Sequence, residues 1–315
     1  MYKYKIFNNI AEDGINVLKS HDFILDENNP DALLLRSQVL SSDDFNKSLR
    51  CIGRAGAGTN NIPSEEATKK GIVVFNTPGA NANAVKELVV CGLLLSSRGI
   101  IQGNTFSKTL DGLDTSDLNS AMEEQKKLFK GTELKGKTLG IVGLGAIGSL
   151  VAQTARSMGM KLVGYDPHIS IDSAWRLPKE VEKAESLEAL LSISDYISLH
   201  VPLVEATKDL ISIEKLKHCK KGAKLINLSR GGIVKNDDII SALDSGIVSR
   251  FVTDFPTPEL ISRSISTQDV ILLPHLGAST NEAEINCAFM ACDQVSNFLL
   301  HGNIINSINF PPIRL

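Results

Sequence analysis

Three residues of the types that transfer protons and bind carboxylates stand near the expected ends of buried strands. Arg230 follows an apolar run at 224–228, Glu259 lies in the loop after a run at 250–253, and His275 follows a run at 270–273. An arginine binds a carboxylate bidentately, and a histidine exchanges a proton at neutral pH. A carboxylate beside the histidine raises its pKa and orients its ring. Beside a nicotinamide, this set suits the reversible oxidation of a 2-hydroxy acid.

Each of these residues alone also has a structural explanation. Arg230 is compatible with a surface arginine, His275 with a hydrogen-bonded structural histidine, and Glu259 with a solvated loop acid. Their shared position favours the catalytic interpretation, because ligands of a doubly wound sheet bind beyond the carboxyl ends of its strands. His200, at the end of a run at 196–201, is expected near a cofactor through its backbone, with a packing role for its imidazole.

A nicotinamide cofactor is indicated by the stretch 137–166. An expected strand at 138–142 leads into Gly143, Gly145 and Gly148, a helical pattern follows, and a second strand at 161–165 ends at Asp166. The glycines allow a tight turn, close approach of a pyrophosphate and packing of helix on strand. The helix N-terminus attracts the diphosphate. Asp166 is placed to bond a ribose 2′-hydroxyl and to repel a 2′-phosphate, so we expect NAD rather than NADP.

The elements that position these residues alternate between strand and helix signals, which predicts parallel sheets with crossover helices. Further strands are expected at 4–7, 32–35, 51–53 and 72–75, and a long apolar helix at 83–98. We expect residues 99–136 to be polar and irregular. The lysines in and directly after this stretch make a solvated linker face or, alternatively, steer an anionic substrate; they are Lys126, Lys127, Lys130, Lys135 and Lys137.

Composition excludes several classes of protein. The 315 residues are 43% hydrophobic with a formal net charge of −3, which gives no electrostatic case for nucleic acid or an anionic membrane. The five cysteines have no CxxC pair and no metal-ligand spacing. We therefore expect no metal, and free thiols in a reducing cytoplasm. No apolar run is long enough to span a bilayer, and the N-terminus lacks the apolar region of a signal peptide.

The chain resembles the D-2-hydroxyacid dehydrogenase family over nearly its whole length. The resemblance rests on RAGAGTNNI at 54–62, NTPGANANAVKEL at 76–88, GLGAIG at 143–148, HVPL at 200–203, NLSRGGIV at 227–234 and PHLGAST at 274–280. It implies an α/β fold with two doubly wound parallel-sheet domains. A Rossmann-type NAD domain at 98–280 is inserted into a flavodoxin-like substrate domain at 1–97 and 281–315. The active site is then expected in the cleft between the domains, and the enzyme is expected to be a homodimer or a higher homo-oligomer.

The resemblance also implies a role for each motif residue. Arg230 holds the substrate carboxylate and carbonyl, His275 is the acid/base, and Glu259 pairs with it, although here Pro258 precedes the glutamate where the family usually has a proline just after it. The implied cofactor contacts are Gly143, Gly145, Ala146, Ile147, Gly148, Asp166, His200, Val201, Pro202, Leu228, Ser229, Asp254 on the nicotinamide side, and Gly277. The implied substrate contacts are Arg54 to a phosphate, the backbone N–H groups of Ala55, Gly56 and Ala57, and Asn81.

The implied reaction is the NAD-dependent oxidation of a phosphorylated 2-hydroxy acid, 3-phosphoglycerate, which is the first step of phosphorylated serine biosynthesis. A reductase for another small 2-keto acid, such as hydroxypyruvate or glyoxylate, is the alternative among enzymes. An NAD-sensing protein without turnover is the alternative outside them. The sequence ends at Leu315, soon after the last expected helix, so we expect no C-terminal regulatory domain.

Overall fold

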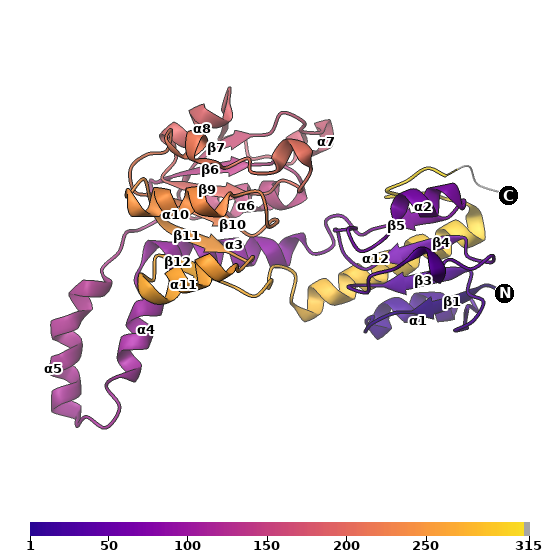
Figure 1. The fold of residues 1–315 in the computed structure, drawn as a ribbon, viewed down its shortest axis with the longest axis horizontal. Coiled ribbons are helices and arrows are strands. Elements are labelled where there is room, and N and C mark those ends of the chain that lie inside the picture. The colour runs from indigo at the N-terminus through magenta and orange to yellow at the C-terminus, as the bar shows by residue number, and fades with distance from the viewer. Residues whose placement is uncertain (312–315) are drawn as a thin grey trace. The chain divides into compact units, whose positions relative to one another are not determined.

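Two parallel sheets organise the chain, one in each of two units, in a computed structural model that describes residues 1–311 (Figure 1). The first unit contains Met1–Ala84 and the chain from Ala278 onward, and the second is Val85–Gly277. The division therefore falls earlier than the expected boundaries at 97/98 and 280/281, and most of the helix α3 (Ala82–Ser97) belongs to the second unit. The expected range of the first domain ends in residues 312–315, which lie outside the described residues.

The first unit is a five-stranded sheet in the order β2-β1-β3-β4-β5, with every neighbouring pair parallel. This is the flavodoxin-like order. Its elements are β1 (Lys3–Ile6), α1 (Glu12–Ser20), β2 (Ile24–Leu25), β3 (Ala32–Leu35), the 3-10 turn Ser42–Asp44, β4 (Cys51–Arg54), α2 (Ser64–Lys69), β5 (Val73–Phe75) and α12 (Asn281–His301). Apolar residues of α1 and α12 pack on one face of the sheet, and Ala67 of α2 packs on the other.

The second unit is a seven-stranded parallel sheet in the order β12-β11-β10-β9-β6-β7-β8. Read from β6 outward on either side, this is the doubly wound dinucleotide-binding order. Its strands are β6 (Thr138–Val142), β7 (Lys161–Tyr165), β8 (Val181–Lys183), β9 (Tyr196–Leu199), β10 (Ala223–Asn227), β11 (Val248–Thr253) and β12 (Val270–Leu272). Together the two sheets confirm the predicted fold class.

Helices cover both faces of this seven-stranded sheet. Residues of α3 and α6 share one apolar cluster with Ile141, whereas residues of α8 to α11 share the other with Val142. Ile141 and Val142 point to opposite faces because side chains alternate along a strand. The helices are α6 (Ala146–Ser157), α7 (Ile171–Trp175), α8 (Leu187–Ile193), α9 (Ile213–Leu216), α10 (Asn236–Asp244) and α11 (Pro258–Ser266), with a 3-10 turn at Glu205–Thr207.

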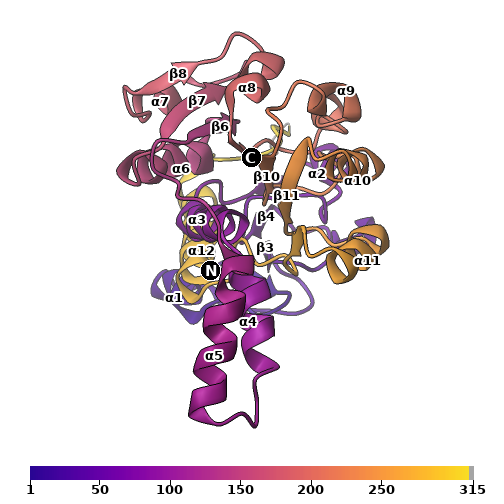
Figure 2. The ribbon, with the colours of Figure 1, turned by 90° about the vertical axis from the view of Figure 1, so that its left-hand side faces the viewer.

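The prediction of irregular structure over 99–136 was wrong. Residues Ile100–Lys108 form α4 and Thr115–Gln125 form α5, followed by a 3-10 turn at Lys126–Phe129. Both ribbon views show the two helices side by side, projecting from the sheet of their unit (Figures 1 and 2). The Phe106 ring of α4 contacts the Phe129 ring of the 3-10 turn, with centroids 5.4 Å apart. Its apolar residues are too sparse to give a clear helical period, and this is why the pattern was missed.

Candidate active site

The register of the second sheet places the sequence-predicted residues of this unit along one edge. The partners Leu272, Thr253, Asn227, Leu199, Val142 and Tyr165 form one row across six strands. Because the strands are parallel, the residues that follow each member of the row emerge at the same carboxyl edge. These are His275, Asp254, Arg230, His200, the Gly143–Gly148 turn and Asp166.

The glycine turn leaves room for a ligand at one position and no room at two others. Gly143 has φ +91°, and a Cβ there would lie 2.5 Å from the carbonyl oxygen of His200. A Cβ on Gly148 would lie 2.0 Å from the Gly143 carbonyl oxygen. A Cβ on Gly145, the N-cap of α6, would meet nothing within 4 Å. The protein itself does not fill the space before the positive end of α6, so the turn fits the pyrophosphate of a dinucleotide.

Asp166 both supports this turn and lines the adjoining pocket. Its Oδ2 accepts a hydrogen bond from the Leu144 N–H at 2.8 Å, and its Oδ1 accepts one from the His168 N–H at 2.9 Å. Each carboxylate oxygen keeps a further lone pair, which can accept a ribose hydroxyl. The pocket, of about 350 Å³, is lined by Leu144, Gly164, Tyr165, Asp166, Pro167, Ile169, Leu177, Val181, Lys183, Ala184 and Glu185. Its lining is mostly apolar, with Asp166, Lys183 and Glu185 as its charged residues, and this composition fits an adenosine.

His200 is held neutral beside the turn. Its Nε2 shares a 2.8 Å hydrogen bond with the Ser198 hydroxyl, and its buried Nδ1 has no partner among the described residues. Burial lowers the pKa of His200 to about 4. Its imidazole is therefore uncharged at neutral pH, which is compatible with its burial beside the glycine turn.

Arg230 is presented by a turn that the side chain of Asn227 organises. Asn227 ends β10 and is buried; its Nδ2 donates to the Arg230 carbonyl at 2.8 Å, and its Oδ1 accepts from the Ser229 N–H and hydroxyl at 3.2 and 2.9 Å. The half-buried guanidinium donates to the Ser229 carbonyl at 2.6 Å, and burial lowers its pKa. The sequence interpretation missed Asn227, although an amide at a strand end, before a glycine pair, was the available signal.

His275 stands on a loop that is fixed by Asp254. The Asp254 side chain is 1% exposed, and its two oxygens accept hydrogen bonds from the Leu276 and Gly277 N–H groups at 2.8 and 2.7 Å. The Asp254 carbonyl accepts from the His275 N–H at 3.2 Å. His275 has φ +57°, and its exposed ring meets Phe255 edge-on with centroids 5.2 Å apart. Asp254 therefore fixes the backbone of the loop that carries His275.

Glu259 is not brought to His275 in this structure. It lies exposed in the first turn of α11, whose N-cap is Thr257 and whose first residue is Pro258. The pKa of Glu259 is lowered, first by its own backbone N–H and then by the Thr257 hydroxyl, with no contribution from His275. Proline is favoured at the first position of a helix, so the departure from the expected loop register is the start of α11.

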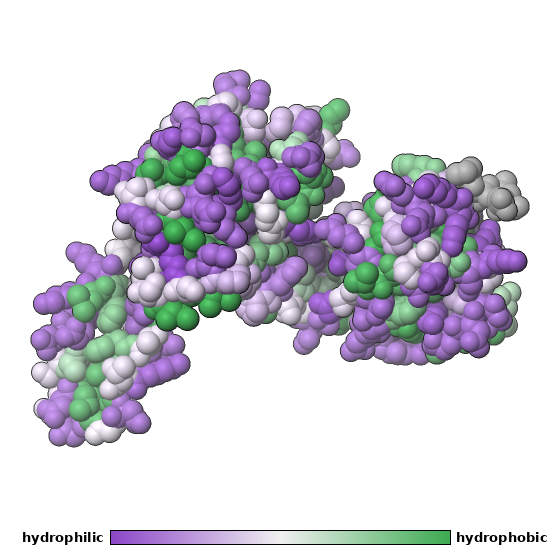
Figure 3. Space-filling view, viewed as in Figure 1, coloured by the Kyte–Doolittle hydropathy of each residue, from purple (hydrophilic) through white to green (hydrophobic). Residues whose placement is uncertain are grey.

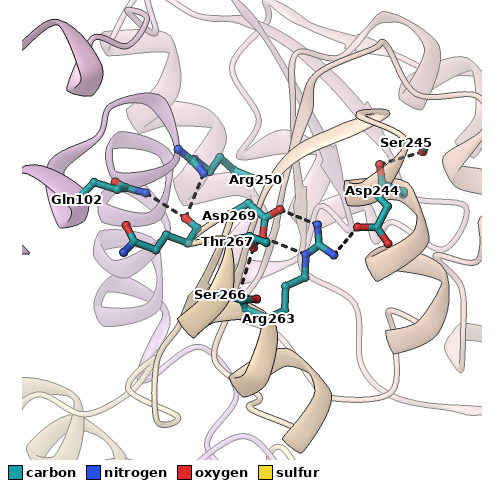
Figure 4. A network of polar contacts seen from close by, with 10 residues as sticks. Gln102, Asp244, Ser245, Arg250, Arg263, Ser266, Thr267 and Asp269 are labelled. Atoms are coloured by element: carbon teal, nitrogen blue, oxygen red, sulfur yellow. Dashed lines mark hydrogen bonds and ion pairs between the residues drawn. The ribbon is translucent and has the colours of Figure 1, made fainter.

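The far end of α11 is anchored by a network of charges (Figure 4). Arg263 donates from Nε and Nη2 to the two oxygens of Asp269 at 3.0 and 2.7 Å, and from Nη1 to Asp244 at 2.7 Å. Gln102 and Arg250 both donate to the Gln268 carbonyl, at 3.0 and 3.1 Å. These contacts tie α11, α10 and the base of α4 to the start of β12.

Apart from Arg230, the residues expected to bind substrate all lie in the first unit. Arg54 ends β4, and its guanidinium lies over the following loop, since a Cβ on Gly56 would be 1.8 Å from Arg54 Nη1. Gly56 has φ +148°, a conformation that glycine tolerates best. The N–H groups of Ala55 and Gly56 already donate to the carbonyls of Leu35 and Arg54, at 2.8 and 2.9 Å. Asn81 is half-buried immediately before α3.

Two further observations concern the part of the chain that the structure describes. No helix within it combines the length and the apolar character needed to cross a membrane. No group of three or more histidine, cysteine, aspartate or glutamate residues in the same part could hold a metal ion.

Comparison with known proteins places this architecture in a family. Residues 96–277 match the model described as "D-isomer specific 2-hydroxyacid dehydrogenase, NAD binding domain". The chain belongs to this family. The match contains the glycine turn, Asp166, Arg230 and His275, so the second unit is the NAD-binding domain of a D-2-hydroxyacid dehydrogenase and its cofactor is NAD. The resemblance read from the sequence motifs is thereby confirmed.

Two relatives of this chain share one name. The D-3-phosphoglycerate dehydrogenase of Bacillus subtilis is 35% identical over 327 aligned residues, which cover 99% of this chain and 59% of that protein. The human D-3-phosphoglycerate dehydrogenase is 37% identical over 281 residues, which cover 86% of this chain and 49% of that protein. The chain thus spans about half the length of these relatives.

Solved structures of the family share the fold. The NAD⁺-bound 3-phosphoglycerate dehydrogenase of Entamoeba histolytica aligns with a TM-score of 0.77 and 25% identity, covering 98% of this chain and 99% of that one. The holo D-mandelate dehydrogenase of Rhodotorula graminis aligns with a TM-score of 0.84 and 22% identity, covering 100% of this chain and 99% of that one. The second likeness concerns the fold alone.

Proposed function

We propose that this dehydrogenase oxidises D-3-phosphoglycerate to 3-phosphohydroxypyruvate with NAD, and catalyses the reverse reduction. The observation that carries the proposal is the common strand edge on which Arg230 and His275 stand beside the glycine turn and Asp166. The names of the relatives at 35% and 37% identity favour the phosphorylated three-carbon acid among 2-hydroxy acids.

In the proposed reaction Arg230, His275 and Glu259 have separate roles. Arg230 binds the substrate carboxylate and carbonyl through its guanidinium, which partial desolvation strengthens as an ion-pair donor. His275 takes the proton of the C2 hydroxyl during oxidation and returns it during reduction. Bound NAD supplies the acceptor for the C2 hydride. Glu259, a carboxylate at neutral pH, is proposed to approach His275 and stabilise its imidazolium.

The proposal extends to the remaining site residues. Arg54 is proposed to bind the substrate phosphate, and the loop that follows it (Ala55, Gly56 and Ala57) to bind a carboxylate through backbone N–H groups. Asn81 is proposed as a further substrate contact. The proposed cofactor contacts are those of the glycine turn (Gly143, Gly145, Ala146, Ile147, Gly148), Asp166, the HVP segment (His200, Val201, Pro202), Leu228, Ser229, Asp254 and Gly277.

A substrate panel tests the proposal. Purified protein is mixed with NADH and, in turn, 3-phosphohydroxypyruvate, hydroxypyruvate or glyoxylate, and the loss of NADH absorbance is followed. We expect the phosphorylated acid to have the highest kcat/KM. A higher value for glyoxylate or hydroxypyruvate would replace the phosphoglycerate assignment with that of another 2-keto acid reductase. NADH binding without turnover of any of these acids would favour the alternative of an NAD-sensing protein that is not an enzyme.

We also propose that the protein is a homodimer joined through the helical hairpin of α4 and α5. These helices have nine and eleven residues, too short to be stable without packing partners. Figure 3 shows hydrophobic residues among hydrophilic ones over the hairpin, and its exposed apolar side chains are Ile100, Ile101, Leu113, Met122 and Leu128. The hairpin carries Asp111 and Asp114 between its two helices and Asp117 in the first turn of α5, whereas Lys126, Lys127 and Lys130 follow α5.

This distribution of charge fits a second copy of the same hairpin. In a two-fold arrangement of antiparallel hairpins, the acidic tip of one lies against the basic base of the other. Sedimentation velocity should then give a dimer for the wild type and a monomer for Leu128→Glu. The control Ile171→Glu places the same change on the exposed face of α7 and should leave the dimer intact. A monomeric wild type would overturn the proposal.

A further inference from the structure

The loop after β4 is held by two of its carbonyl groups. The Gly56 carbonyl accepts a hydrogen bond from the Thr77 N–H at 3.1 Å, and the Ala57 carbonyl accepts one from Asn76 Nδ2 at 2.7 Å. Asn76 and Thr77 directly follow β5, the strand that neighbours β4. Consecutive residues of one segment therefore fix consecutive peptide groups of the loop.

Fixing these carbonyls also fixes the direction of two N–H groups. In a planar trans peptide the carbonyl of one residue and the N–H of the next point in opposite directions. The Ala57 N–H must therefore point away from Thr77, and the Gly58 N–H away from Asn76. Whereas the Ala55 and Gly56 N–H groups donate to carbonyls, no such bond engages Ala57 or Gly58 within residues 1–311. The loop thus offers the N–H group of Ala57, which belongs to the predicted set, and that of Gly58, which does not.

The segment that fixes the loop is itself held by Gln294 of α12. Gln294 is 5% exposed, and its Nε2 donates to the Asn76 carbonyl and to the Met290 carbonyl, both at 3.0 Å. Both of these carbonyl groups can only accept hydrogen bonds, so the NH₂ of the Gln294 amide must face them. The Oε1 is left buried without a partner among the described residues. A buried, half-satisfied amide disfavours folding relative to an apolar side chain of the same size. A functional advantage is therefore needed to explain a glutamine at this buried position.

We propose that Gln294 is a positioning residue for carboxylate recognition. By holding Asn76, it keeps the Ala57 and Gly58 N–H groups turned toward one side of the loop before any substrate arrives. Donors that are oriented in advance bind an anion without paying for reorientation at the moment of binding. The inference rests on the proposed function for its ligand, the carboxylate of a 2-oxo acid.

The test is a comparison of two amide-to-apolar variants on one helix. Gln294→Met removes the donor at nearly constant volume. Asn297→Leu removes an amide that donates only to Asp293 within α12, at 3.0 Å. We expect Gln294→Met to raise the KM for 3-phosphohydroxypyruvate about 2- to 10-fold, the effect of one net hydrogen bond, with the KM for NADH and kcat nearly unchanged. The control should leave all three constants unchanged.

A second variant tests the order of the contacts. Asn76→Ser cannot reach the Ala57 carbonyl and should raise the same KM. Because Gln294 and Asn76 act on one loop, the double variant should raise the KM less than the product of the single effects. Full multiplicativity would mean that the two residues act separately and would overturn the proposed relay. Asn76→Ser also carries the kinetic test by itself if Gln294→Met does not fold.

Amide hydrogen exchange tests the inference without turnover. Peptides covering residues 55–62 should exchange faster in Gln294→Met than in the wild type or in Asn297→Leu, while peptides from β6 to β12 remain unchanged. Unaltered exchange together with an unaltered KM would overturn the role of Gln294. If the wild type reduces none of the 2-oxo acids, the proposed function fails, and the exchange comparison still decides whether Gln294 orders the loop.

Discussion

The Asp254 carboxylate accepts a 2.7 Å hydrogen bond from the main-chain N–H of Gly277, two residues beyond His275. With its second oxygen on the Leu276 N–H at 2.8 Å, this buried acid sets the path of the backbone that carries the histidine. The loop therefore depends on a charge-assisted acceptor rather than on a regular strand or helix.

Asp254→Asn should weaken both stability and catalysis. An asparagine keeps one acceptor and turns an NH₂ toward a backbone N–H, so one charge-assisted bond is lost. We expect the free energy of unfolding in urea to fall by about 1.5–3 kcal/mol. Displacement of His275 should lower kcat about 10- to 100-fold. The control Asp172→Asn, on the exposed first turn of α7, should change neither quantity.

The acid/base assignment gives a second prediction. His275→Ala should lower kcat by about 10²–10⁴, the usual range for the loss of a general acid/base. Glu259→Gln should lower the pKa of His275, because a carboxylate stabilises the imidazolium. Reduction of the keto acid needs protonated His275, so its rate should fall at lower pH in this variant than in the wild type. An identical pH profile would show that Glu259 does not pair with His275 in the working enzyme.

Much of the fold was predictable from the sequence because the buried strands appear as short apolar runs. The bounds of β3, β6 and β7 were predicted to the residue, since their apolar runs end in clear turn residues. The sequence did not reveal β2 and β8, because these largely exposed strands have only two and three residues, too few to give an apolar run of strand length. The hairpin of α4 and α5 was missed because its packing surface is small and polar residues dominate it.

For the candidate site, the sequence predicted which residues lie at the same edge of the sheet but not which side chains contact one another. Parallel strands must bring their carboxyl ends to one edge, and this alone grouped Arg230, Asp254 and His275. The side-chain partners did not follow, since nothing in the spacing of Glu259 and His275 fixes the distance between two exposed groups, one in the first turn of α11 and one on a loop. Asn227 and Gln294 were also missed, because their roles are hydrogen bonds to backbone, which leave no residue pattern.

Asp166 gives a prediction about cofactor choice. Its carboxylate repels a 2′-phosphate, so kcat/KM with NADH should exceed that with NADPH at least tenfold, about 1.4 kcal/mol. Asp166→Ser should reduce this ratio by raising the NADPH value. It should also lower the value for NADH, because the Leu144 N–H in the glycine turn loses its 2.8 Å acceptor. Equal efficiency of the wild type with both cofactors would contradict the assignment.

His200 gives a prediction about pH and stability. Its pKa is lowered to about 4 by burial, below the ordinary value of 6.5. Between these values the unfolded chain binds a proton at this residue and the folded chain does not, so the free energy of unfolding falls as the pH falls. The loss should reach about 2–3 kcal/mol near pH 4. Urea unfolding of His200→Gln should show a smaller loss over this range, whereas the exposed His218→Gln should behave as the wild type does.

The last prediction concerns the phosphate. Arg54 ends β4 with its guanidinium over Gly56, immediately before the loop whose N–H groups face one side. If Arg54 binds the phosphate, 3-phosphohydroxypyruvate should exceed hydroxypyruvate in kcat/KM by about 10- to 10²-fold, the effect of one charge-assisted contact. Arg54→Ala should remove most of this ratio and leave hydroxypyruvate turnover nearly unchanged. Arg50→Ala, which precedes β4 at its opposite end, is the matched control and should preserve the ratio. A wild type that reduces both acids equally well leaves no phosphate site to assign to Arg54, and the enzyme would then act on 2-keto acids generally.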